Sequence, residues 1–414
     1  MTSLTPDVLS MVGPPALIAL PESAGPRPAG WSVYVHFPYC LHRCSYCDFA
    51  TTVARDIPRQ AYLAAILNEL TLRTAALEAA PMRTIFFGGG TPSLWGAACI
   101  AAVLAWLDKW GGISEDTEIT MEANPGALEI GDLAGYAAAG INRVSIGVQA
   151  LDDDRLRALD RLHDAQGAHS TLAQLQQLLQ NGRLKSASAD LIFGGPGQTR
   201  DDLRQDLRAV LDYGLPHLSA YSLTVEPETP LFTRIKRGLQ RPPDDDLQAE
   251  MLQVVPQWVA AYGLTRYEVS NFARPDLQCR HNLAYWQGDH YLAVGVGAHG
   301  FLPQAGHVGR RYANTRAHHA WLTALQTHKL AEEFQEDIDR SSHLTERLLT
   351  GLRLDAGLDL AALRRDIGAQ WVAQLLERVA RLKTRGSSFI IENHYLRVDP
   401  TQMHWLDGLV AQLA

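Results

Sequence analysis

Three cysteines within eight residues, Cys40, Cys44 and Cys47, constrain this chain more than any other feature. They follow an apolar segment and have the spacing C-x3-C-x2-C. A cubane iron–sulfur cluster is normally held by four cysteine thiolates, so a loop with three of them leaves one iron free to bind another ligand. The spacing therefore predicts a [4Fe–4S] cluster with Cys40, Cys44 and Cys47 as metal ligands and one open iron.

A zinc site is the alternative reading of the same loop. C-x3-C and C-x2-C both lie within zinc spacings, and His36 or His42 would complete a tetrahedron. Structural zinc sites usually draw their ligands as two pairs from separate loops, however, and here all three cysteines are bunched in one loop. The pattern favours the iron–sulfur cluster.

Composition limits the class of protein. The chain has 414 residues, the size of about two to three domains, with a net charge of −8 and scattered basic residues, so we expect no nucleic-acid partner. Its five cysteines form no disulfide framework, which indicates a reducing compartment, and we expect a cytoplasmic protein. The apolar stretch from Leu9 to Leu20 is interrupted by Pro14-Pro15 and lacks a basic leader, so neither a signal peptide nor a transmembrane segment is expected. Residues 1–30 are interpreted as a flexible N-terminal segment.

From residue 31 onward, short β-branched or aromatic runs alternate with longer helical patterns. This order is expected of βα units on a parallel sheet, and six units predict a partial, open (β/α)6 TIM-like barrel of the α/β class. The expected strands are Ser32–Phe37, Arg83–Phe87, Glu118–Glu122, Arg143–Val148, Ser188–Phe193 and His217–Thr224. The expected helices between them are Arg59–Ala79, Trp95–Lys109, Ile130–Ala139, Ala165–Leu179 and Arg200–Tyr213.

The pattern changes after about Phe301. Three helices are expected at Arg316–Thr327, Ser341–Leu352 and Leu360–Leu375, followed by a short hairpin at Phe389–Arg397. We therefore expect a barrel with an extension over residues 31–300 and a smaller, mostly helical C-terminal domain over residues 301–414.

The notable polar motifs fall at the ends of the expected strands, where the functional residues of parallel barrels collect. The second strand runs into F-G-G-G-T-P, whose glycines allow the backbone to approach a ligand closely, although such a run is also common in tight turns. The third ends in Glu122 within E-A-N-P, which is either a ligand-binding carboxylate or a helix cap. Gln149 and Arg161 follow the fourth strand. Asp190 lies in the fifth, where a buried carboxylate needs a partner or a ligand.

Together these motifs resemble the oxygen-independent coproporphyrinogen III oxidase family of radical S-adenosylmethionine (SAM) proteins, from Tyr34 through the C-terminal domain. The resemblance rests on Y-x-H-x-P-x-C, F-G-G-G-T-P, E-x-N-P, R-x-S-x-G-x-Q, L-x-R-x-H and D-L-I-x-G. It implies that SAM binds at the open iron. By the same resemblance, the SAM-binding residues are Tyr34, Tyr46, Gly89, Gly90, Thr91, Glu122, Gln149, Arg161 and Asp190. Gly195 departs from the family, which more often has Leu there.

Two features separate this chain from the oxidases of that family. The oxidases read C-x3-C-x2-C-x-C, whereas Phe49 stands here in place of the fourth cysteine. The segment after Cys279 contains H-N-x-x-Y-W, and both features resemble the haem-chaperone (HemW-type) branch. His281, Tyr285 and Trp286 then form a candidate haem-contact patch, since imidazole ligates iron and aromatic rings stack on flat macrocycles. The alternative is that His281 is a hydrogen-bonded core residue.

The resemblance implies a haem chaperone that binds a [4Fe–4S] cluster, SAM and haem, and delivers haem to client haemoproteins or respiratory haem enzymes. The alternative is a coproporphyrinogen III oxidase in which a 5′-deoxyadenosyl radical starts decarboxylation of propionates. We assign no catalytic residue, because Phe49 argues against oxidase activity. The sequence is compatible with a homodimer but does not determine the oligomeric state or the client.

Overall fold

The computed structural model describes residues 29–413 and divides into two compact units, with the boundary between Asp339 and Arg340. The expected flexible segment 1–30 lies outside the described residues, except for its last two positions. Each unit is described below by itself.

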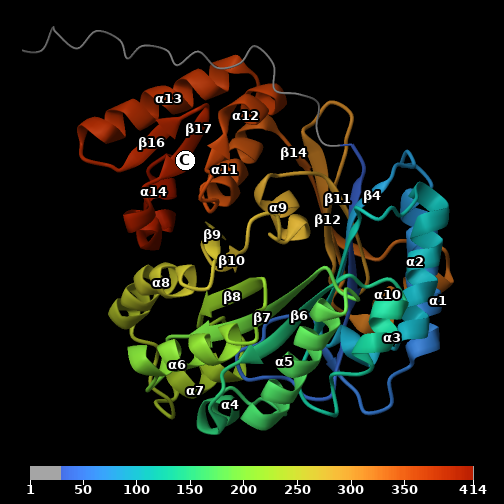
Figure 1. Cartoon of the computed structure of the whole chain (residues 1–414). Coiled ribbons are helices and arrows are strands. Elements are labelled where there is room, and N and C mark those ends of the chain that lie inside the picture. The colour runs from blue at the N-terminus through green and yellow to red at the C-terminus, as the bar shows by residue number, and fades with distance from the viewer. Residues whose placement is uncertain (1–28, 414) are drawn as a thin grey trace, which may run out of the picture. The chain divides into compact units, whose positions relative to one another are not determined.

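The first unit is built on a twelve-stranded open sheet (Figure 1). Its strand order is β14-β13-β12-β11-β1-β4-β5-β6-β7-β8-β10-β9, and the strands from β11 to β8 in that order are parallel. The six expected barrel strands are confirmed as β1 (Trp31–Phe37), β4 (Met82–Gly89), β5 (Glu118–Ala123), β6 (Arg143–Gln149), β7 (Ser186–Phe193) and β8 (His217–Ser222). The open, partial-barrel fold class is thereby confirmed.

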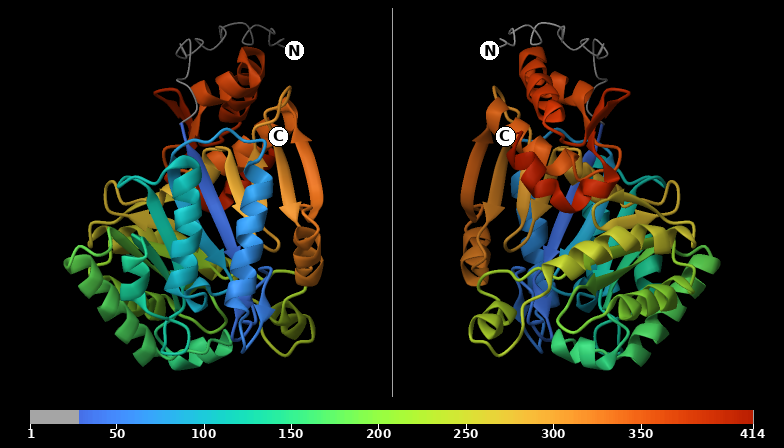
Figure 2. Two further views of the ribbon diagram at one scale, coloured as in Figure 1. Left: turned by 90° about the vertical axis from the view of Figure 1, so that its right-hand side faces the viewer. Right: turned by 90° about the vertical axis from the view of Figure 1, so that its left-hand side faces the viewer.

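Helices cover the outer face of this sheet, and Figure 2 shows α1 and α2 side by side against it. In β6, Val144, Ile146 and Val148 are buried in the hydrophobic core. Ser145 and Gln149 alternate with them and face the barrel interior, so the strand alternates apolar and polar or small residues. The helices of the unit are α1 (Arg59–Thr74), α2 (Ala97–Gly111), α3 (Leu133–Ala138), α4 (Asp153–Ala158), α5 (Ala165–Gln180), α6 (Arg200–Leu211), α7 (Pro230–Lys236), α8 (Asp245–Ala260), α9 (Arg280–Trp286) and α10 (His318–Gln326).

Helix α6 illustrates how local sequence sets these elements. Thr199 and Asp202 form a reciprocal capping box that satisfies free N–H groups of the first turn. Leu203, Leu207 and Val210, spaced three and four apart, are all buried. Residues 199–211 therefore determine both where the helix begins and which of its faces is buried.

The sheet continues beyond the expected end of the barrel, so the boundary expected between residues 300 and 301 differs from the division in the structure. The added strands are β9 (Thr265–Glu268), β10 (Asn271–Ala273), β11 (Tyr291–Val294), β12 (His299–Leu302), β13 (Gly309–Asn314) and β14 (Glu332–Ile338). Strand β14 pairs only with β13, and five of its seven residues are exposed. Such a charged edge strand lacks the apolar alternation by which strands are found in sequence.

A buried ion-pair network joins α1 to this added sheet. Arg73 donates to Glu69 (Nε–Oε1, 2.8 Å) and to Asn314 and Glu332 (both 2.5 Å), and its guanidinium lies 3.8 Å from the ring centroid of Tyr312. Glu69 also accepts hydrogen bonds from the N–H of Gly295 and from other buried donors. Because both charges are removed from water, each depends on the other for stabilisation.

We expect Arg73→Ala to lower the free energy of unfolding by roughly 3–5 kcal/mol, because it leaves the carboxylate of Glu69 buried without its cation. The matched control is Arg157→Ala, which removes an ion pair to Asp154 whose side chains are 72% and 81% exposed and should cost less than about 1 kcal/mol. Urea unfolding followed by tryptophan fluorescence gives both values. Equal shifts of the urea midpoint for the two variants would contradict this account.

The second unit is mostly helical, as expected. It contains α11 (Arg340–Gly351), α12 (Leu360–Ile367), α13 (Ala369–Thr384) and α14 (Leu406–Ala411), with a three-stranded sheet of β15 (Leu358–Asp359), β17 (Tyr395–Val398) and β16 (Phe389–Glu392). The hairpin expected at Phe389–Arg397 is confirmed as β16 and β17. The single helix expected over Leu360–Leu375 is interrupted at Gly368, whose φ of +97° lies outside helical values. Among residues 29–413, none of the helices combines the length and the apolar character that crossing a bilayer would take.

Candidate functional site

The cysteine loop leaves the carboxyl end of β1 and is anchored to it by backbone and imidazole contacts. His36 bonds the carbonyl of Ala50 through Nε2 (2.9 Å) and the hydroxyl of Tyr34 through Nδ1 (3.0 Å). Thr52 N donates to the carbonyl of Pro38 (2.7 Å), which closes the loop at its far end. Burial lowers the pKa of His36 to about 4, so the imidazole is neutral near pH 7. Because both ring nitrogens are engaged, His36 offers no free lone pair to a metal.

The glycine turn after β4 packs directly against this loop. Gly90 N donates to the carbonyl of Phe37 (2.7 Å), and Thr91 N donates to the carbonyl of Tyr39 (2.9 Å). A Cβ on Gly90 would lie 2.7 Å from the oxygen of Tyr39, and one on Gly89, whose φ is +116°, would lie 2.5 Å from the ring of His36. The turn therefore needs glycine for close approach to the cysteine loop, in addition to any contact with a ligand.

We expect Gly90→Ala to cost about 1–3 kcal/mol of stability and to reduce iron retention, because the methyl group would push the turn away from Tyr39 and Cys40. Gly195→Ala is the matched control, since a Cβ there meets only Leu223, at 3.8 Å. Iron and sulfide content after anaerobic reconstitution, together with the unfolding midpoint, measures both effects. Indistinguishable iron content in the two variants would refute the requirement for close approach.

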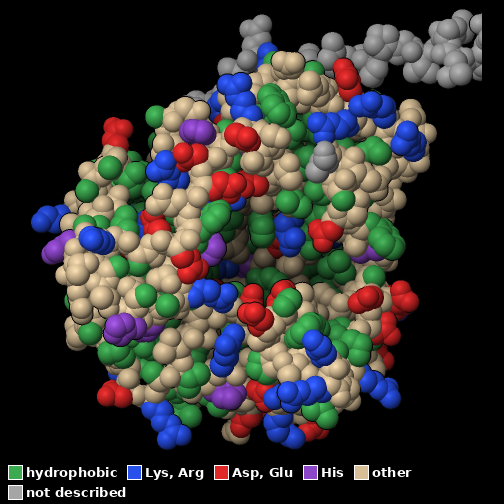
Figure 3. Space-filling view, turned by 180° about the vertical axis from the view of Figure 1, so that it is seen from behind, with side chains coloured by type: hydrophobic (Ala, Val, Ile, Leu, Met, Phe, Trp, Pro, Cys, Tyr) green, Lys and Arg blue, Asp and Glu red, His purple; other side chains and the backbone are tan. Residues whose placement is uncertain are grey.

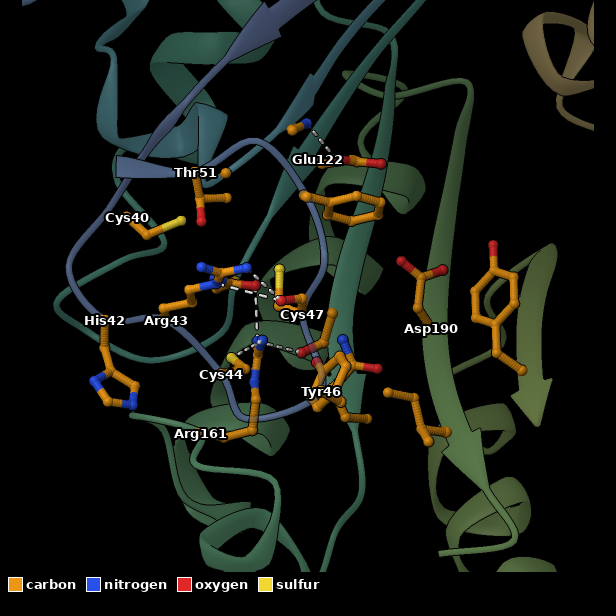
Figure 4. A pocket seen from close by; sticks show the side chains of 18 of the residues that line it. Cys40, His42, Arg43, Cys44, Tyr46, Cys47, Thr51, Glu122, Arg161 and Asp190 are labelled. Atoms are coloured by element: carbon orange, nitrogen blue, oxygen red, sulfur yellow. Dashed lines mark hydrogen bonds between the residues drawn. The ribbon is translucent and has the colours of Figure 1, made fainter. Parts of the chain in front are cut away.

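The loop, the glycine turn and the ends of the next strands enclose a cavity of about 380 Å³, called here the outer cavity (Figure 4). The three cysteine side chains line it, and so does the aromatic side chain of Phe49, which is 59% exposed. Of the SAM-binding residues expected from the sequence, the outer cavity brings together Tyr46, Gly89, Gly90, Glu122, Gln149, Arg161 and Asp190. Gln149 has a φ of +66°, an uncommon value for a residue other than glycine and one that is often found at functional sites.

Two expected SAM residues lie beside this cavity instead of lining it. Thr91 is 1% exposed and hydrogen-bonds the Cys40 thiol, and Tyr34 lies deeper in the barrel, with its ring 6.1 Å from that of Phe86. Within residues 29–413, no three His, Cys, Asp or Glu side chains converge as they would around a single metal ion. His42 does line the outer cavity.

A hydrogen-bonded chain connects two of the cysteines across the outer cavity. Asn124 Nδ2 donates to Thr91 Oγ1 (3.2 Å), which bonds Cys40, and Arg161 Nη2 donates to Asn124 Oδ1 (2.7 Å). Arg161 Nη1 lies 3.4 Å from Cys44 Sγ (Figure 4). Asn124 was not selected from the sequence, although its place at the end of β5 in E-x-N-P was the available signal. It holds Thr91 and Arg161 in fixed positions relative to the thiols.

The thiols are buried in a way that favours their neutral form. Burial raises the pKa of Cys40 to about 12, against the opposing hydrogen bond from Thr91, and burial also raises the pKa of Cys47. Thiolates are the metal-binding form, so loading a metal centre here must release protons. Three thiols that face one cavity beside a close-packed glycine turn are a donor set that fits an iron–sulfur cluster.

Two carboxylates form the deeper wall of the outer cavity. Glu122 accepts from Gly89 N (3.0 Å), and burial raises its pKa to about 7, with a further increase from nearby Asp190. Asp190 accepts from Ser145 (3.0 Å) and Ser188 (3.3 Å), and burial raises its pKa as well. A cationic or hydroxyl-bearing ligand would stabilise the ionised forms of both groups.

We expect Glu122→Gln to stabilise the metal-free protein at high pH. The carboxyl titrates near pH 4.3 in the unfolded chain and near 7 in the folded protein, so its contribution to stability is complete below pH 4.3 and is lost as the pH rises through 7. Glutamine does not titrate and can keep the bond from Gly89. The gain over wild type should grow to about 2–3 kcal/mol between pH 5 and pH 8, measured by urea unfolding at both pH values. A gain that is independent of pH would contradict the raised pKa.

The structure does not bring the expected haem-contact residues into the outer cavity. His281 lies 1% exposed towards the amino-terminal end of the barrel strands, where Nδ1 bonds Thr84 Oγ1 (2.7 Å) and Nε2 bonds Tyr285 OH (2.8 Å). Burial lowers the pKa of His281 to about 3. His281 and Tyr285 line a second cavity of the barrel, whereas Trp286 lines neither cavity.

Charged side chains of both signs are interspersed over the face seen in Figure 3. They do not gather into one broad basic area on that face. This distribution agrees with the scattered basic residues of the sequence and gives no electrostatic track for a nucleic-acid backbone there.

Comparison with known families gives two matches in this chain. The Radical SAM superfamily matches residues 34–210, and the HemN C-terminal domain matches residues 338–402. The second match begins close to the division between the two units. Among solved structures, coproporphyrinogen III oxidase (HemN) from Escherichia coli has the same fold, with a TM-score of 0.77 at 20% identity over 93% of this chain and 90% of that one. The fold and the cysteine loop are those of radical SAM proteins.

Curated relatives define the branch. The heme chaperone HemW of Mycobacterium tuberculosis (strain CDC 1551 / Oshkosh) is 36% identical over 356 residues, covering 85% of this chain and 89% of that protein. The radical S-adenosyl methionine domain-containing protein 1, mitochondrial, of Mus musculus is 38% identical over 356 residues, covering 85% and 78%. The chain belongs to the oxygen-independent coproporphyrinogen III oxidase-like family of radical SAM proteins, in its haem-chaperone (HemW-type) branch.

Proposed function

We propose that the protein is a haem chaperone that carries a [4Fe–4S] cluster on Cys40, Cys44 and Cys47, binds SAM in the outer cavity, and passes haem to client haemoproteins. The chain belongs to the HemW-type branch, and the observation that carries the proposal is the identity of residue 49. Phe49 stands at the position where the oxidases have a fourth cysteine. Its side chain lines the outer cavity and is largely exposed, so an aromatic surface replaces a thiol at the mouth of the site.

The proposed cluster fits the donors of the loop. The three thiols come from one short loop, and Arg161 and Thr91 give hydrogen bonds to two of them. Such bonds and the local burial are the means by which a protein tunes the potential of a bound cluster. When bound, the cluster would supply electron transfer to SAM at its open iron.

The proposed SAM residues then have distinct tasks. The backbone of Gly89 and Gly90 would receive the amino group of the methionyl moiety, and Glu122 would accept from an ammonium or from ribose hydroxyls. Gln149, Arg161 and Asp190 present polar groups to the rest of the cavity, with Tyr46 beside Arg161. Tyr34 and Thr91 would act by positioning His36 and Cys40, since neither lines the outer cavity.

Haem is the proposed cargo, with contacts at His281, Tyr285 and Trp286. Iron ligation by His281 would require breaking its bond to Thr84 or to Tyr285, because both ring nitrogens are engaged. Contact with the rings of Tyr285 and Trp286 has no such requirement. The proposed recipients of the haem are client haemoproteins, including respiratory haem enzymes. The proposed oligomeric state is a homodimer.

The proposal is tested with anaerobically reconstituted protein. We expect hemin to bind with a shifted absorption band, and we expect incubation with dithionite, SAM and coproporphyrinogen III to yield no protoporphyrinogen. Cys44→Ser should lose iron and sulfide, whereas Cys99→Ser, which changes a buried cysteine outside the cavity, should retain both.

Three outcomes would count against the proposal. Turnover to protoporphyrinogen without hemin binding would establish the oxidase alternative, whose fold this chain shares. Zinc in place of iron would remove both functions and bring His42 into consideration as a ligand. Transfer of bound haem to an apo-haemoprotein tests the delivery step, and its absence would reduce the protein to a haem-binding one.

A further inference from the structure

A second cavity lies inside the barrel next to the outer cavity. This inner cavity has a volume of about 190 Å³ and shares Glu122, Ser145, Asp190 and Tyr221 with the outer cavity. Tyr221 is 40% exposed, so one shared wall is accessible. Ligand sites for whole drug-sized molecules usually measure about 300–1,000 Å³, so the inner cavity has room for one arm of a ligand or for a very small molecule.

Arg143 is the unusual side chain of this cavity. It is the first residue of β6 and lines the inner cavity, yet only 3% of it is exposed. Its Nε is buried without a hydrogen-bond partner. Among residues 29–413, no side chain lies within hydrogen-bond or ion-pair distance of the guanidinium in a bonding geometry. An arginine has five N–H donors, and burying them unpaired is costly.

The two carboxyl groups and the imidazole around the inner cavity already have partners. Glu122 accepts from Gly89, Asp190 accepts from Ser145, and His281 is bonded through both ring nitrogens. Against the lowering effect of burial, Glu118 and Asp190 act on Arg143 electrostatically and raise its pKa, but neither forms a hydrogen bond or an ion pair with it in the described residues. The guanidinium of Arg143 is therefore the strong donor that is left for a ligand.

Part of the wall of the inner cavity is aromatic. Phe86 stacks on His281 with ring centroids 5.0 Å apart, and Tyr34 and Tyr285 complete this wall. A cavity lined by aromatic rings and one planar cation suits a short alkyl chain that ends in a carboxylate, because guanidinium and carboxylate form paired, charge-assisted hydrogen bonds.

We propose that the inner cavity binds an alkyl carboxylate, with Arg143 as its anion-binding residue and with Phe86, Tyr34 and Tyr285 around the alkyl chain. If the proposed haem function holds, the ligand is a propionate arm of haem, a reading that rests on that proposal. The same chemistry would also bind a small free carboxylate such as propionate.

The test compares Arg143→Met with Arg83→Met in the full-length protein. Arg83 is an arginine of the same sheet whose charge is paired with Asp289 (2.8 Å), and it lies outside the inner cavity. We expect wild type and Arg83→Met to bind hemin about tenfold or more tightly than hemin dimethyl ester, and Arg143→Met to bind both equally. The urea midpoint should be unchanged or raised by Arg143→Met and lowered by Arg83→Met, because only Arg83 loses an existing ion pair.

A second arm uses propionate labelled with ¹³C at the carboxyl group. A carboxyl shift on binding to wild type that disappears in Arg143→Met supports the inferred site even if hemin does not bind, an outcome in which only the haem function fails. Propionate binding together with an equal affinity of wild type for hemin and its ester assigns the site to a small free carboxylate. Absence of both the ester discrimination and the propionate shift would overturn the inference, as would Arg143→Met destabilising the protein while leaving both ligand effects intact.

Discussion

The close backbone contact between the cysteine loop and the glycine turn is the constraint on which the rest of the site depends. Gly90 and Thr91 donate to carbonyls of residues 37 and 39, and there is no space for a side chain on Gly90. This contact sets where Cys40 enters the outer cavity and brings Thr91 beneath its sulfur. From Thr91 the hydrogen-bonded chain reaches Asn124, Arg161 and Cys44, so two thiols owe their positions to a few backbone bonds.

The barrel interior combines two cavities with different electrostatic character. The outer cavity presents sulfur, glycine backbone and two carboxyl groups, whereas the inner one presents an unpaired arginine and an aromatic wall. Glu122 and Asp190 belong to both, and a ligand that ionises them from one side changes the field on the other. Ionisation of these two carboxyl groups by a cation in the outer cavity would add negative charge to the wall that the cavities share. It would therefore weaken the binding of an anion in the inner cavity, without any movement of the sheet.

Most of the fold and of the outer cavity could be predicted from sequence for a simple reason. In a parallel sheet the carboxyl ends of the strands share one edge, so motifs found after successive strands must meet. Strands β9 to β14 escaped prediction because they are short or charged. The boundary was therefore expected before the helix at 318–326, whereas the two compact units divide after it. In the sequence, Arg143 could be noted only as the first residue of the motif R-x-S-x-G-x-Q. A sequence does not reveal that a buried guanidinium lacks a hydrogen-bond partner.

The raised pKa values of Cys40 and Cys47 have a consequence for the reactivity of the metal-free protein. Peroxides and disulfides are attacked by thiolates, so neutral buried thiols react slowly with them. Without a bound metal, Cys40 and Cys47 should therefore react more slowly with such oxidants than a thiol of ordinary pKa does. Binding of a metal centre by these two thiols would therefore release a proton from each of them.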